Sequence, residues 1–151
     1  MAALEPWKHI LVAVDGSTHS RLALDAAASL ALRANAELLI LSVGSTAGLA
    51  PSLAWGMAVD FTDLQEEVDA AAMRVVSEAS GRVTSAVKVT TRFRRGHPAA
   101  EILQQIEDGR HDLVVLGSRG RGVFGGLIGS VSHHVLHHSP VAVMVLHAPP
   151  E

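Results

Sequence analysis

The chain has 151 residues, of which 48% are hydrophobic and 18% are charged, a composition typical of one globular domain and not of a disordered chain. A formal net charge of −3 argues against a broad basic surface for nucleic acid, and the absence of cysteine excludes disulfides and thiolate metal sites. No apolar run approaches the roughly 20 residues of a membrane span, and the early run ILVAV is too short for a signal-peptide core, so we expect a single cytoplasmic domain over residues 1–151 without nucleic-acid or membrane partners.

Five short runs rich in β-branched and apolar residues recur along the chain, and most are apolar almost throughout. That character favours strands covered on both faces, as in a parallel sheet. The five predicted strands are residues 9–15, 36–43, 87–93, 112–117 and 141–146.

Helical patterns separate the predicted strands. Residues 17–36 begin with a cap candidate, Ser17 or Thr18, and are rich in Ala and Leu. The other helices are indicated by apolar residues at three- and four-residue spacing between 64 and 79, by Pro98 at a first helical position, and by Val131, Val135 and Leu136. This alternation predicts a doubly wound α/β domain, in which ligands bind at the carboxyl ends of the strands where the strand order reverses.

The most unusual stretch is GSRGRGVFGGLIGS, residues 117–130, between a predicted strand and a predicted helix. Glycines let backbone N–H groups approach a ligand closely, and the start of the helix at Ser130 favours phosphate. Arg119 and Arg121 add positive charge, so the stretch is typical of an anion cradle; the alternative is a plain surface loop. No lysine follows these glycines, which excludes a Walker A loop. The position about 20 residues beyond the glycines is Val145 and not an acid, which disfavours a dinucleotide fingerprint.

Four segments resemble the universal stress protein family in order and spacing, and together they span essentially the whole chain: VAVDGS, GHPAAEIL, DLVVLGSRGRG and GSVSHHVLHHSPVAVMVL. The resemblance implies a five-stranded parallel sheet in the order 3-2-1-4-5 with helices on both faces. The family's glycine signature is matched by Gly117, Gly120, Gly129 and Ser130. Eight residues separate Gly120 from Gly129, one fewer than in the signature.

For the site, the resemblance implies ATP bound with Mg²⁺ or Mn²⁺. Ala13, Asp15 and Val43 would hold the adenosine, while the glycines and the helix start would hold the phosphates. The implied nucleotide-binding residues are Ala13, Asp15, Val43, Gly117, Ser118, Arg119, Gly120, Gly129, Ser130 and Val131. Since no second carboxylate or positioned base accompanies Asp15, we expect at most slow ATP hydrolysis.

The resemblance further implies a stress-response regulator whose nucleotide state controls association with an unidentified protein partner. The shorter glycine spacing leaves an alternative, a dimeric stress protein that binds no nucleotide and acts only through protein contacts. In either case we expect a homodimer through residues 141–146, an apolar edge strand that lacks a charged guard. At the opposite edge, Arg92, Arg94 and Arg95 are expected to block pairing.

Two further features leave alternatives open. His133, His134, His137 and His138 form two i,i+4 pairs, a spacing that can ligate zinc or nickel in a metal sensor. They lie opposite the apolar arc of their helix without a carboxylate among them, which favours a solvated face, so we assign no metal site. In residues 44–58, Trp55 and Met57 either form a mobile lid over the base or a small satellite core.

Overall fold

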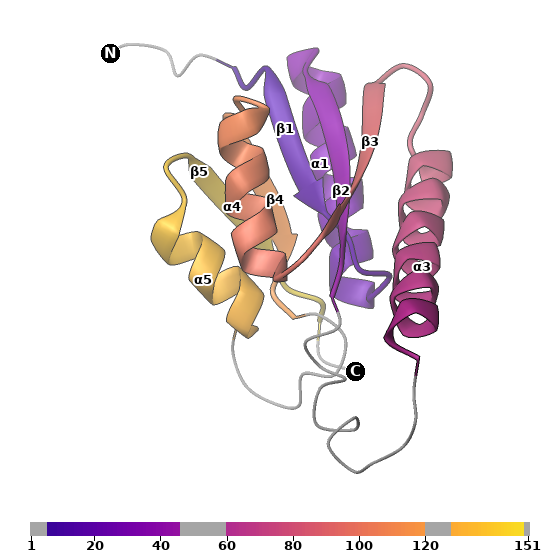
Figure 1. Cartoon of the computed structure of the whole chain (residues 1–151). Helices are drawn as coiled ribbons and strands as arrows, with labels where there is room; N and C mark the ends of the chain where they lie inside the picture. The colour runs from indigo at the N-terminus through magenta and orange to yellow at the C-terminus, as the bar shows by residue number, and fades with distance from the viewer. Residues whose placement is uncertain (1–5, 46–59, 120–127, 150–151) are drawn as a thin grey trace.

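The computed structural model describes residues 6–45, 60–119 and 128–149 (Figure 1). Their five strands form one parallel sheet in the order β3-β2-β1-β4-β5, which confirms the predicted topology. The strands are β1 His9–Ala13, β2 Glu37–Gly44, β3 Lys88–Arg95, β4 Leu113–Gly117 and β5 Ala142–Leu146. The helices are α1 Thr18–Ala34, α3 Phe61–Arg82, α4 Pro98–Asp108 and α5 Ser130–His138.

Helices cover both faces of the sheet, which gives three layers (Figure 1). Alternate residues of β1 divide between two cores: Ile10 and Val12 pack with α1 and α3, whereas Leu11 packs with α4 and α5. All three side chains are fully buried. The near-continuous apolar runs of the sequence thus belong to strands that are covered on both sides, as expected for a parallel sheet.

The helix starts follow the predicted capping chemistry. Of the two candidates at the first helix, Ser17 is the N-cap, and its side chain accepts a hydrogen bond from the backbone N–H of Ser20. Pro98 is the first residue of α4. A backbone N–H at this position makes no hydrogen bond within the helix, so proline, which lacks the N–H, costs no hydrogen bond there. Among the described residues, no helix combines the length and apolar character that crossing a bilayer demands.

The arginines of edge strand β3 bond to the helices on both faces of the sheet. Arg94 donates to Glu101 at 2.7 Å and to Asp108 at 3.1 Å, both on α4. Arg95 forms an ion pair with Asp69 of α3, and this contact lowers the pKa of that carboxyl group. Arg92 also bonds to α4, through Gln105, so all three side chains expected to guard the edge also tie β3 to its covering helices.

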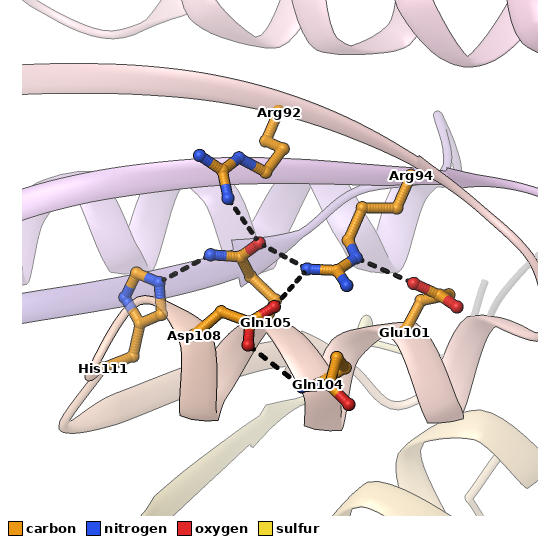
Figure 2. A network of polar contacts seen from close by, with 7 residues as sticks. All are labelled: Arg92, Arg94, Glu101, Gln104, Gln105, Asp108 and His111. Carbon is orange, nitrogen blue, oxygen red and sulfur yellow. Dashed lines mark hydrogen bonds and ion pairs between the residues drawn. The ribbon is translucent and has the colours of Figure 1, made fainter.

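A buried amide organises the polar contacts beneath β3 (Figure 2). Arg92 and Arg94 each donate to Oε1 of Gln105, at 3.2 and 3.0 Å. This fixes the amide orientation, so Nε2 of Gln105 faces Nε2 of His111 at 3.3 Å. Because an amide NH₂ can only donate, His111 accepts through Nε2 and carries its proton on Nδ1. Burial lowers the pKa of His111, in keeping with a neutral ring.

Candidate functional site

The strand order reverses between β1 and β4, the switch point at which doubly wound sheets bind ligands. From the end of β1 the chain continues into α1 on one face, and from the end of β4 it leads to α5 on the other (Figure 1). The starts of α1 and α5 therefore flank the switch point at the carboxyl edge of the sheet, where this fold class predicts a ligand crevice. Most of the residues predicted to bind nucleotide lie around it.

Asp15 is held in a tight turn between β1 and α1. Its Oδ1 accepts a hydrogen bond from the backbone N–H of Ser17 at 2.9 Å, and its own N–H donates to Oγ of Ser20 at 3.3 Å. Gly16 between them has a φ of 82°, which glycine adopts without strain. The turn fixes a half-buried carboxylate beside the switch point, between β1 and the start of α1.

Gly117 ends β4 in close contact with the first turn of α1. A Cβ at this position would lie 2.6 Å from the carbonyl carbon of His19, closer than real Cβ atoms approach. On the other side, the hydroxyl of Ser132 in α5 donates to the carbonyl oxygen of Gly117 at 2.6 Å. Glycine is thus required here because the first turn of α1 leaves no room for a Cβ.

Ser118 joins four segments and is fully buried. Its Oγ lies 2.8 Å from Nδ1 of His19, and its N–H donates to the carbonyl of Leu146 at the end of β5. Its carbonyl accepts the N–H of Gly129. Because the N–H of Ala148 also donates to Nδ1 of His19, that nitrogen is an acceptor and the serine hydroxyl is the donor. The sequence analysis missed His19, since no local pattern links residues 19 and 118.

The start of α5 faces the crevice without a side-chain cap. Gly129 is the N-cap, with φ −64° and ψ 157°, and makes no capping hydrogen bond. The first N–H groups of a helix have no intrahelical acceptor, and the helix dipole adds partial positive charge there. Within the described residues, Gly129 is buried, Val131 is half-buried and Ser130 is exposed. The chemistry of this helix start suits a phosphate group.

The remaining predicted residues lie on the same edge of the sheet or outside the described residues. Ala13 and Val43 are half-buried near the carboxyl ends of β1 and β2, against the core shared with α4 and α5. Arg119 follows Ser118 and is half-buried. The described residues do not include Gly120, Arg121, Trp55, Met57 or positions 46–58 of the predicted lid.

Two cavities of the described residues lie away from this crevice. One of about 350 Å³ is lined by side chains of α3 and β3, including Met73 and Phe93. The other, of about 200 Å³, lies near the amino ends of β1 and β2 beside His9 and His111. Neither cavity is lined by a residue predicted to bind nucleotide.

Comparison with known proteins places this geometry in context. Residues 6–147 match the model of the universal stress protein family. Universal stress protein YxiE of Bacillus subtilis is 36% identical over 143 residues, which cover 91% of this chain and 97% of that protein. Universal stress protein UspA from Lactobacillus plantarum has a similar structure, with a TM-score of 0.69 at 28% identity over 92% of this chain and 97% of that one. A universal stress protein crystallised in complex with cAMP has a TM-score of 0.67 at 26% identity over 94% and 98% of the two chains.

Proposed function

The chain belongs to the universal stress protein family, and from that premise we propose that it binds an adenine nucleotide, ATP with Mg²⁺ or Mn²⁺, in the crevice between α1 and α5. The observation that carries the proposal is the backbone hydrogen bond from Gly129 to Ser118. It holds the uncapped start of α5 against the end of β4, where the free N–H groups can receive phosphate oxygens. The related protein in complex with cAMP supports an adenine nucleotide as the ligand class.

The adenosine end of the ligand would lie across the ends of β1 and β2. The carboxylate of Asp15, oriented by its bond to Ser17, is suited to accept hydrogen bonds from ribose hydroxyls. Ala13 and Val43 offer half-buried apolar surface for the base. No group in the described part of this crevice pairs a second carboxylate with Asp15, so we propose a binding protein with slow ATP hydrolysis at most.

Two variants separate the phosphate and nucleoside ends of the site. Gly129→Ala adds a methyl group at the α5 N-cap, where φ −64° and ψ 157° are open to alanine without strain. Asp15→Asn keeps an Oδ1 for the Ser17 N–H but removes the charge. By calorimetry, Gly129→Ala should weaken ATP about tenfold, the equivalent of 1.4 kcal/mol, and leave adenosine affinity nearly unchanged. Asp15→Asn should weaken both ligands.

Gly81→Ala is the matched control, because a Cβ at residue 81 of α3 meets nothing within 4 Å. It should bind ATP as the unmodified protein does. Titration with cAMP and AMP in the same experiment identifies the preferred nucleotide. If both site variants retain unchanged affinity for ATP, the nucleotide site is assigned wrongly.

We further propose that the nucleotide state regulates association with a partner through the homodimer edge at β5. The N–H of Ser118 at the crevice donates to the carbonyl of Leu146, the last residue of β5, at 2.7 Å. This bond joins the proposed phosphate end directly to the edge strand. A shift of the β4 end on nucleotide binding would therefore reach the proposed dimer surface through one hydrogen bond.

The alternative function is a dimeric stress protein that acts only through protein contacts. The exposure of β5 favours it, since Val143, Met144, Val145 and Leu146 are half-exposed on an edge strand. Mass spectrometry of the freshly purified, denatured protein distinguishes the two functions. Co-purified ATP or AMP supports the nucleotide-binding protein, whereas a ligand-free protein that ignores added ATP supports the alternative.

A further inference from the structure

One face of α5 carries four exposed histidines that the proposed nucleotide site does not use. They are His133, His134, His137 and His138. The opposite side of the helix is buried through Ser132 and Val135. In the described part of the chain, none of the four rings forms an ion pair.

The four rings form two close pairs, each spanning one turn. The ring centres of His133 and His137 are 4.5 Å apart with an interplanar angle of 56°. Those of His134 and His138 are 4.2 Å apart and stacked at 21°. Each pair thus places two imidazole rings side by side on the exposed face of α5.

A backbone hydrogen bond prepares one ring as a ligand. Nδ1 of His138 lies 2.9 Å from the carbonyl oxygen of His134. A carbonyl only accepts, so Nδ1 carries the proton and, in the neutral ring, the lone pair is on Nε2. Metal-bound histidines almost always donate their second ring nitrogen to an acceptor of this kind, which fixes the tautomer and the ring orientation.

We propose that this face of α5 is a chelating site for a late first-row divalent cation, with each i,i+4 pair able to supply two imidazole nitrogens. With metal–nitrogen bonds of about 2.1 Å, imidazoles on adjacent octahedral or square-planar corners have ring centres about 4.6 Å apart, against about 5.3 Å for tetrahedral corners. The 4.5 Å separation of His133 and His137 matches the first value. The spacing of this pair therefore suits Ni²⁺ or Cu²⁺, whereas the stacked rings of His134 and His138 would have to turn to share a cation.

The described residues contain no group of three or more His, Cys, Asp or Glu side chains placed to hold a metal ion. Each chelate consequently has two protein ligands, and water fills the other positions. A cation that bridges two turns of α5 binds the folded helix and not the unfolded chain, so it stabilises the fold by mass action. The site is thus suited to a readily exchanged cation at the protein surface.

The test uses the nucleotide-free protein without an affinity tag, with NiCl₂ as the only probe, by calorimetry and thermal unfolding. The double variant His133→Ala with His134→Ala breaks both pairs, because the remaining His137 and His138 are adjacent and do not face each other on a helix. It should weaken Ni²⁺ binding about tenfold or more, because the second nitrogen no longer binds intramolecularly.

The matched control removes the same number of histidines but keeps one pair. In His134→Ala with His138→Ala, the pair His133 and His137, whose ring separation suits adjacent ligand positions, is intact, so Ni²⁺ should bind with nearly unchanged affinity and still raise the unfolding temperature. Circular dichroism verifies that both variants fold, as expected for alanine at exposed helical positions. Equal losses of affinity in the two double variants, or no Ni²⁺ binding by the unmodified protein, would overturn the proposal.

Discussion

The hydroxyl of Ser118 donates to Nδ1 of His19 across 2.8 Å and so joins the end of β4 to the first turn of α1. The serine is fully buried, and the same imidazole nitrogen also accepts the N–H of Ala148 beyond β5. One ring thus holds together the two strands and the helix that meet at the candidate site. We therefore expect the Ser118 and His19 side chains to contribute to the free energy of unfolding as a coupled pair.

Ser118→Ala should lower the free energy of unfolding by about 1 kcal/mol, the usual net value of a buried hydrogen bond. His19 would retain Ala148 as a donor, so the variant leaves no unpaired Nδ1. Urea unfolding of the single variants and of the double variant with His19→Ala measures the coupling. Strictly additive effects of the two substitutions would show that the hydrogen bond contributes nothing.

Gly117→Ala should destabilise the protein more than Ser118→Ala does. The new methyl group would lie 2.6 Å from the carbonyl carbon of His19, and backbone atoms within α1 cannot move aside as a flexible side chain can. Overpacking of this kind costs about 1–3 kcal/mol. Urea unfolding measures the loss, and ATP affinity should fall with it because the start of α1 would be displaced from β4.

Gly81→Ala is the control for this substitution, since the same chemical change takes place in open space. A Cβ at Gly81 meets no atom within 4 Å, and the residue lies near the end of α3. Alanine in a helix is favoured over glycine by about 0.5–1 kcal/mol, so this variant should be slightly more stable than the unmodified protein. If the Gly117→Ala variant is as stable as the Gly81→Ala variant, α1 and β4 do not lie as close together at Gly117 as the structure indicates.

The neutral ring of His111 predicts a loss of stability on mild acidification. Burial lowers the pKa of His111 in the folded protein, whereas the unfolded chain titrates near the ordinary value of about 6.5. Below that pH the unfolded state binds more protons, so the free energy of unfolding decreases as the pH falls toward the lowered pKa. Protonated Nε2 would also face the amide NH₂ of Gln105, which is itself a donor.

His111→Gln removes the titrating group while its carbonyl oxygen can still accept from Gln105. The variant should therefore lose less stability between about pH 6.5 and pH 5 than the unmodified protein does. Urea unfolding at several pH values in this range makes the comparison. Parallel pH profiles for the two proteins would show that His111 is not the group responsible.

Local sequence patterns were sufficient for the elements but not for the contacts between them. The apolar runs located all five strands to within two residues at each end, because strands covered on both faces have to be apolar almost throughout. The turn at Asp15 and the helix start at Ser130 were also found from short motifs. The strand order came from the resemblance to a family, because no local pattern specifies it.

The sequence did not reveal which side chains, distant along the chain, form hydrogen bonds with each other in the fold. Ser118 and His19 are 99 positions apart, and nothing near either residue indicates the other. The arginines of β3 looked like guards of a free edge, yet Arg94 bonds to Glu101 and Asp108 because α4 crosses that face of the sheet. Such pairings depend on tertiary placement, which composition and periodicity do not encode.

The free edge of β5 gives a direct test of the proposed homodimer. The carbonyl of Leu146 points toward β4, where it accepts the N–H of Ser118. Since successive residues of a strand direct their N–H and C=O groups to alternate sides, Met144 also faces β4, whereas Val143 and Val145 face the open edge. A second copy that pairs antiparallel about a twofold axis would use these outward groups.

Val143→Pro removes one outward N–H and leaves the hydrogen bonds between β4 and β5 in place, so it should yield a folded monomer. Met144→Pro is the control, because it removes an inward N–H and should destabilise the sheet before it affects association. Light scattering at high micromolar concentration gives the mass of each protein, and circular dichroism gives the fold. The unmodified protein should be a dimer because an apolar, uncharged edge such as Ala142–Leu146 needs a partner strand to avoid aggregation. A monomeric unmodified protein, or a Val143→Pro variant that stays dimeric, would exclude β5 as the interface.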